Sequence, residues 1–232
     1  MPIDAQTPSS EGWWLHRLLR QLAARQDRLN RLDRYYRGDP DLPYGPENSA
    51  TAFRRFQRKA RTNWAALIVE ATRERMRPTG FRTGVSGDEN GDEAAFRIWQ
   101  ANGLDSDSAL VHRAKLSMGD AYVIVGGVEP DLGVPLITPE DPRQVITAHD
   151  PRRPRKVIAA LKTFADDITG DDLAYLYLPG VVHRARRSRT TPGATPVTLG
   201  TGLGGWEWEA HDLLPVADVP VVRFANRPDL FG

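Results

Sequence analysis

Residues 52–84, AFRRFQRKARTNWAALIVEATRERMRPTGFRTG, carry the pattern that decides the fold of this chain. Apolar residues recur here at steps of three and four, which predicts one amphipathic helix with a single apolar face. The helix should end at Arg77, because Pro78 disfavours helical backbone at the residue before it and Gly80 permits a turn. The apolar positions are Phe53, Phe56, Ala60, Trp64, Leu67, Ile68, Ala71 and Met76.

The opening turns of this expected helix are unusually basic. Arg54, Arg55, Arg58, Lys59 and Arg61 fall within eight residues. Such a cluster predicts contacts with a neighbouring subunit or with a polyanion, since cations that bind phosphates give sequence-independent, salt-sensitive affinity. We favour pairing with acidic residues of another copy over direct DNA contact.

Three residues of the same helix are expected to pack in the core of the molecule. Trp64, Leu67 and Ile68 lie on the apolar face, and we expect them to anchor the helix in the core.

The upstream sequence predicts a second long helix. Ser9 or Ser10 can cap it, and it should run to about Arg37, before a Gly-Asp-Pro turn. A heptad-like seam allows a two-stranded coiled coil, but it lasts only about three heptads, so we expect the helix to pack on its own domain. The seam comprises Leu15, Leu18, Leu22, Leu29, Leu32 and Tyr36, with Arg25 at its one polar position. Trp13 and Trp14 should lie at an exposed N-terminus and mark a partner surface.

Downstream, the pattern changes from helix to strand. Two short helices are expected at 92–101 and 105–117, and Ala121–Val125 is typical of a buried strand. Alternating segments separated by Pro, Gly and Asp turns then predict a mostly antiparallel sheet. These segments are 80–83, 135–138, 144–149, 157–164, 173–178, 181–186, 206–208 and 219–224, with a Gly-, Thr- and Pro-rich loop at 187–205. The fold class is therefore α+β: long amphipathic helices followed by a β-rich region.

Three stretches in this order resemble a known family. They are LDRYYRGDPDLPYGP (32–46), QRKARTNWAALIVEATRERMRPTGFRTG (57–84) and FRIWQANGLDSDSALVHRAKLSMGDAYVIVGG (96–127). Together they resemble the N-terminal half of portal proteins of tailed bacteriophages, particularly siphophages of actinobacteria. The resemblance spans most of residues 15–230.

The resemblance implies a structural role rather than an enzyme. It implies a homo-oligomeric ring, a dodecamer in the family, through which double-stranded DNA enters and leaves the capsid at one vertex. The implied partners are the terminase large subunit, a head-completion or adaptor protein, and the scaffold or major capsid protein. Residues 1–118 would form the helical part of the portal wing and residues 119–232 its β-rich part, and the chain would end before the stem and channel helices.

The charge distribution agrees with an assembly role. The formal net charge is only +1, but residues 1–77 carry +6, residues 78–151 carry −7 and residues 152–232 carry +2. This asymmetry suggests head-to-tail contacts between copies or a basic face turned to a polyanion, although two solvated faces of different charge are the plainer interpretation.

Composition also bears on the compartment. The chain has no cysteine, no signal-peptide pattern and no apolar run near the roughly 20 residues of a membrane helix. We expect a soluble protein without a membrane partner, located in the virion and, during assembly, in the host cytoplasm.

No motif in the sequence predicts a catalytic site. Gly200, Gly202 and Gly205 spell GxGxxG, but the following WEWEAHDLL alternates like a strand, so a phosphate-binding helix is not expected. The five histidines are scattered, and we expect no catalytic, metal or cofactor site. Two alternatives remain: a stand-alone phage nucleic-acid-binding module, and a hydrolase that would use Asp166 and Asp171.

Overall fold

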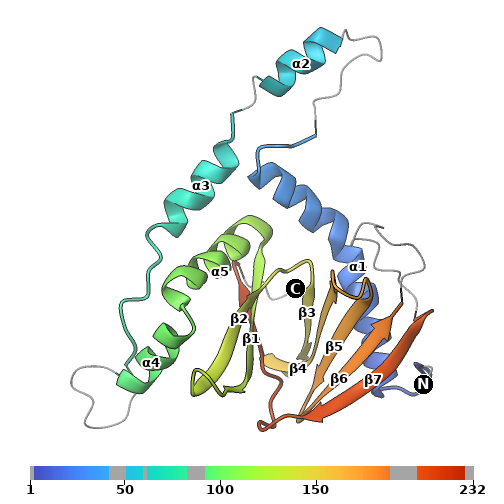
Figure 1. Cartoon of the computed structure of the whole chain (residues 1–232). Coiled ribbons are helices and arrows are strands. Elements are labelled where there is room, and N and C mark those ends of the chain that lie inside the picture. The colour runs from blue at the N-terminus through green and yellow to red at the C-terminus, as the bar shows by residue number, and fades with distance from the viewer. Residues whose placement is uncertain (1–2, 42–50, 60–61, 83–91, 189–202, 228–232) are drawn as a thin grey trace.

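In the computed structural model, residues 3–41, 51–59, 62–82, 92–188 and 203–227 are described (Figure 1). Within 51–59, the side chains at positions 52, 54, 57 and 58 also lie outside the description. These residues form an α+β fold in which helices and two antiparallel sheets are stacked in layers.

The larger sheet is a five-stranded antiparallel meander in the order β3-β4-β5-β6-β7. Its strands are β3 Val145–Asp150, β4 Arg153–Ala165, β5 Asp172–Leu178, β6 Val181–Arg187 and β7 Trp206–Leu213. Successive residues of a strand point to opposite faces of a sheet, so alternate residues serve different layers. On β4, Ala159 and Leu161 belong to one core and Ala160 to the other.

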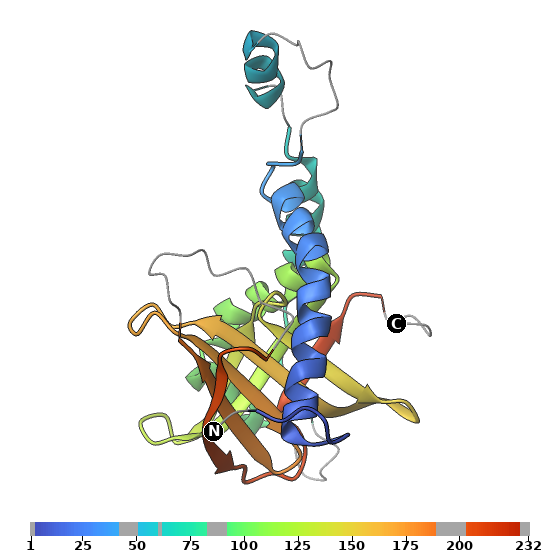
Figure 2. The ribbon, with the colours of Figure 1, turned by 90° about the vertical axis from the view of Figure 1, so that its right-hand side faces the viewer.

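Helix α1, Glu11–Tyr36, covers one face of this sheet (Figure 2). Ser10 caps the helix by accepting a hydrogen bond from the Trp13 backbone N–H at 3.2 Å. Four of its leucines form a buried core with residues of β3 to β7. These are Leu15, Leu18, Leu19 and Leu22 from α1, packed with Ile146, Leu161, Leu176 and Trp206. The helix thus packs on its own sheet, as predicted.

The smaller sheet has three antiparallel strands in the order β2-β1-β8. They are β2 Val134–Glu140, β1 Asp120–Glu129 and β8 Val221–Ala225. Tyr122, Ile124 and Val221 pack on Val145 and Ala160, and so join the two sheets in a second core. The alternate residues of β1 face the other way, toward two further helices.

Those helices are α4, Glu93–Ala101, and α5, Leu104–Met118. Asp92 caps α4, with its carboxylate accepting from the Ala95 backbone N–H at 2.9 Å. Gly103 adopts left-handed backbone (φ 63°) between the two helices, a conformation that glycine allows without steric cost. The predicted break at Asn102-Gly103 is confirmed.

The single helix predicted for 52–77 is wrong. The structure has two helices, α2 Thr51–Lys59 and α3 Trp64–Arg73, and Thr62 and Asn63 between them are not helical. Asn63 takes the N-cap position and accepts a hydrogen bond from the Ala66 backbone N–H at 3.0 Å. A side chain that captures a backbone N–H in this way starts a new helix instead of continuing the old one.

Two smaller predictions are also corrected. The described part of the strand expected at 80–83, residues 80–82, is not a strand, although the Phe81 carbonyl accepts from the Asp92 N–H at 2.9 Å. Trp13 and Trp14 are half-buried rather than exposed, because Trp14 packs against the α1 core and Arg17 lies over the Trp13 ring. Most of the loop expected at 187–205, and Gly200 and Gly202 of the glycine motif, lie outside the described residues.

Candidate subunit interface

Helix α3 is held against α1 and α5 by one carboxylate. Glu70 accepts hydrogen bonds from the Tyr36 hydroxyl at 2.6 Å, from Arg113 Nε at 2.8 Å and from Arg73. The bonds from Arg113 and Tyr36 lower the pKa of Glu70 to about 2. Glu70 is therefore ionised at neutral pH and links three helices through charge-assisted bonds.

A second polar contact fixes the start of α3. The Asn63 side-chain amide donates to the Tyr36 carbonyl at 2.8 Å, near the end of α1. Gly38, with left-handed backbone (φ 75°), lies so close that an added Cβ would be 3.0 Å from the Asn63 amide nitrogen. The side of α3 that faces the body of the molecule therefore carries Glu70 and Arg73, together with the half-buried Ala66 and Val69.

The apolar side of α3 faces outward. Trp64, Leu67 and Ile68 are 65%, 56% and 67% exposed. The expectation that they anchor the helix in the core is wrong for the isolated chain, because the polar contacts of Asn63 and Glu70 turn the opposite face inward. A helix that exposes its apolar stripe presents the type of surface that proteins bury against partners.

Helix α2 extends this exposed surface. It lies beyond α3 and projects away from the sheets in both views (Figures 1 and 2). We call α2 and α3 together the arm. Phe53 and Phe56 are half or more exposed and, three residues apart, share one face. An isolated helix of nine residues is marginal in water, so α2 needs external contacts to be stable.

The predicted basic contacts are only partly visible. Arg55 and Lys59 are exposed on α2, one turn apart. Arg54 and Arg58 belong to α2 but their side chains lie outside the description, and Arg61 lies outside the described residues. Their role as interface or polyanion contacts stays a prediction.

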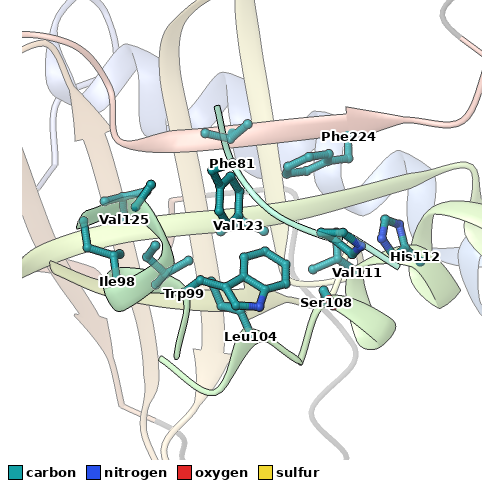
Figure 3. Close-up of a pocket in the computed structure, with 14 residues that line it drawn as sticks. Phe81, Ile98, Trp99, Leu104, Ser108, Val111, His112, Val123, Val125 and Phe224 are labelled. Atoms are coloured by element: carbon teal, nitrogen blue, oxygen red, sulfur yellow. The ribbon is translucent and has the colours of Figure 1, made fainter. Parts of the chain in front are cut away.

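Sequence reasoning missed an apolar cavity on the opposite side of the small sheet from the α1 core. It encloses about 390 Å³ between α4, α5 and the outward face of β1, β2 and β8. Figure 3 shows the Phe81 and Trp99 side chains at this cavity, together with Val123 of β1 and Phe224 of β8. His112 also lines it; its Nδ1 is buried without a hydrogen-bond partner among the described residues, and burial lowers the pKa of this imidazole.

A charged cluster where α1 meets the small sheet was also missed. Asp120 accepts from Arg25 Nη2 and from Arg223 Nε, each at 2.8 Å, and Arg25 also donates to the Tyr122 hydroxyl at 3.0 Å. Arg25, the polar interruption of the leucine seam, therefore has a defined partner. The cluster therefore joins α1 to β1 and β8 of the small sheet.

The residues weighed for catalysis have ordinary structural roles. Asp166 accepts from the Ile168 N–H at 3.0 Å and from Thr169 Oγ1 at 2.8 Å, and so closes the hairpin turn. Asp171 pairs with Arg186 at 3.4 Å. Across the described residues, no three His, Cys, Asp or Glu side chains are grouped so that they could hold a metal ion. No helix in those same ranges is long and apolar enough to cross a membrane.

Comparison with known proteins identifies the family. The model of the family described as phage portal protein, SPP1 Gp6-like, matches residues 15–230. This chain belongs to the phage portal protein family. It is 32% identical over 186 residues to the portal protein of Mycobacterium phage D29, and 31% identical over 186 residues to that of Mycobacterium phage L5. Both matches cover 75% of this chain and 34% of the relative. The portal chain thus spans about a third of the length of the curated relatives that it matches.

Proposed function

We propose that this chain acts as a structural subunit of an oligomeric portal at one vertex of a phage capsid, through which DNA is packaged and ejected. Family membership over residues 15–230 supports the portal role. The assembly role is supported by the orientation of α3. Glu70 faces inward, whereas the apolar side chains of Trp64, Leu67 and Ile68 face solvent.

The proposal extends to partners and to the organisation of the chain. Residues 1–118 and 119–232 are the helical and β-rich parts of one wing, and α1 sharing a core with the five-stranded sheet supports treating them together. The terminase, a head-completion protein, and the scaffold or major capsid protein are the proposed partners. The virion is the proposed location, with assembly in the host cytoplasm.

The test is the mass of the chain in solution by light scattering, with electron microscopy of the same sample. A defined multiple of the chain mass, seen as closed rings, is the expected result. A chain that stays monomeric at all accessible concentrations would contradict the assembly role of this part of the portal.

A matched pair of variants locates the assembly surface. Ile68→Ser removes an apolar side chain from α3, whereas Ile168→Ser removes a 94% exposed isoleucine from a hairpin turn outside the arm. We expect Ile68→Ser to shift the chain toward monomer and Ile168→Ser to leave its mass unchanged.

The exposed cations Arg55 and Lys59 favour a second candidate, a nucleic-acid-binding module. That candidate predicts DNA binding by the monomer, with an affinity that falls steeply as salt is raised. The portal proposal predicts that assembly does not need DNA.

A further inference from the structure

One hairpin turn of this chain combines exposed apolar side chains with acidic ones. It lies where β1 passes into β2, at residues 128–133, and its sequence is VEPDLG. Val128 and Leu132 are 66% and 42% exposed, and Asp131 is exposed beside Leu132. We call residues 128–133 the acidic turn.

The backbone of the acidic turn is held by its own hydrogen bonds. The Glu129 carbonyl accepts from the Leu132 N–H at 3.1 Å and from the Gly133 N–H at 2.8 Å. Gly133 has left-handed backbone (φ 64°), and the ring of Pro130 fixes a further backbone angle. A partner that binds this turn therefore loses little free energy in ordering it.

The sequence around the acidic turn contains acids and no cations. Residues 116–142 include five acidic residues and neither lysine nor arginine. Three of the five form ion pairs outside the turn, namely Asp120, Glu140 and Asp141. The other two, Glu129 and Asp131, form no ion pair with a residue in the described ranges. The unpaired negative charge of this hairpin is therefore concentrated in the turn.

The first part of the arm has the opposite composition. Residues 51–69 include five cations and no acidic residue. Phe56 of α2 is 66% exposed, and Lys59, three residues further along the helix, lies on the same face. Arg55 lies one turn before Lys59, and neither cation forms an ion pair with a described residue. This face of α2 therefore suits a partner that is both apolar and acidic.

One copy does not bring the two surfaces together. In both views, α2 and the acidic turn lie toward opposite ends of the molecule, with the body of the fold between them (Figures 1 and 2). Glu70 binds Tyr36 of α1 and Arg113 of α5, and so holds α3 in place between α2 and the body.

We propose that the acidic turn of one copy docks on α2 of a neighbouring copy. Val128 and Leu132 pack against Phe56, and the two carboxylates of the turn pair with Arg55 and Lys59. This inference rests on the proposed function and deepens it by naming two surfaces that meet. A contact between different surfaces of one chain is heterologous, and repeating it generates a ring when the rotation closes.

A second copy suits α2 better than nucleic acid does. Phosphates would neutralise Arg55 and Lys59 but would leave the ring of Phe56 in water. The acidic turn offers carboxylates and apolar side chains within six residues, so one contact satisfies both needs. The contact also adjoins the exposed apolar face of α3, on the same arm.

Carbodiimide cross-linking tests this docking directly, because the reagent joins a lysine amine to a carboxylate that it contacts. Isotopically labelled and unlabelled chains are mixed, allowed to assemble, treated, digested and examined by mass spectrometry. We expect amide links from Lys59 of one copy to Glu129 or Asp131 of another. Asp167, an exposed acid on the β4–β5 turn, is the internal control and should form no link with Lys59. Links of Lys59 only within its own copy, or only to other acids, would overturn the docking.

A charge exchange provides the second measurement. Lys59→Glu should raise the concentration needed for assembly roughly threefold, the effect of losing an exposed ion pair. Adding Asp131→Lys to the same chain should restore assembly, because the two charges are then exchanged across the contact. Adding Asp167→Lys instead changes the net charge equally and should not restore it. Equal recovery in both double variants would overturn the docking.

The failures of the two proposals are distinguishable. A chain that assembles, by light scattering, but gives no link between Lys59 and the acidic turn overturns the docking and leaves the portal role standing. A chain that neither assembles nor cross-links overturns both the docking and the assembly role.

Discussion

At the scale of single residues, polar side chains join the helices to one another and to the small sheet. Glu70 joins α1, α3 and α5, and Arg25 joins α1 to Asp120 at the start of β1. The sequence could not reveal either partnership, because Glu70 and Arg113 are separated by 43 positions and Arg25 and Asp120 by 95. Periodicity shows which residues share a face, but it does not show what that face contacts.

Glu70→Gln should destabilise the chain by about 1–3 kcal/mol, because it weakens the charge-assisted bonds from Arg113 and Arg73. The folded-state pKa of Glu70, about 2, is below its ordinary value of 4.5, so ionised Glu70 favours the folded state. The advantage of wild type over Glu70→Gln should be full above pH 4.5 and should shrink as the pH falls toward 2. Urea unfolding of both proteins across this range measures it, and a pH-independent difference would contradict the role of the charge.

Arg25→Leu completes the leucine seam of α1. The variant distinguishes a seam that forms a coiled coil from a helix that packs on its own domain and binds Asp120 through Arg25. If the seam were a coiled-coil surface, the variant would be stabilised. We expect a loss of about 1–3 kcal/mol instead, because Asp120 and the Tyr122 hydroxyl lose their donor. A double-mutant cycle with Asp120→Asn should show coupling between positions 25 and 120, and additive effects would contradict a direct contact.

At the scale of elements, strands were the most predictable. Strands β1 to β8 all fall on segments whose alternation and turn residues indicated them, and α4 and α5 separate at the predicted Asn102-Gly103. The prediction of a single helix over 52–77 was wrong for a local reason. The apolar spacing continues through Asn63, but the side chain of Asn63 caps a new helix. The cavity was not predictable, because its wall combines residues of three helix and loop segments with three strands.

Asn63→Ala tests that reason at α3. The change removes the cap and the bond to the Tyr36 carbonyl, and it favours helix through position 63. We expect about 1 kcal/mol of destabilisation, typical of a lost N-cap, and a weaker connection of α3 to α1. Hydrogen exchange should accelerate at Ala66 and through the first turn of α3 while the sheets stay protected. Unchanged exchange at Ala66 would show that this cap does not stabilise the helix.

At the scale of the whole molecule, the chain is almost neutral but has a basic N-terminal third and an acidic middle third. The salt dependence of assembly should show whether these charges form ion pairs between copies. Screening shortens from about 10 Å at 0.1 M salt to about 3 Å at 1 M, so ion pairs between copies weaken, whereas burial of Phe53 and Phe56 does not depend on that screening. Assembly should therefore weaken modestly with salt without disappearing, as followed by light scattering. The double variant Arg55→Gln, Lys59→Gln should assemble less well at low salt and lose most of the salt dependence. If assembly instead required added DNA, and DNA affinity fell by about one power of salt concentration for each phosphate contact, the cations of α2 would serve nucleic acid rather than a neighbouring subunit.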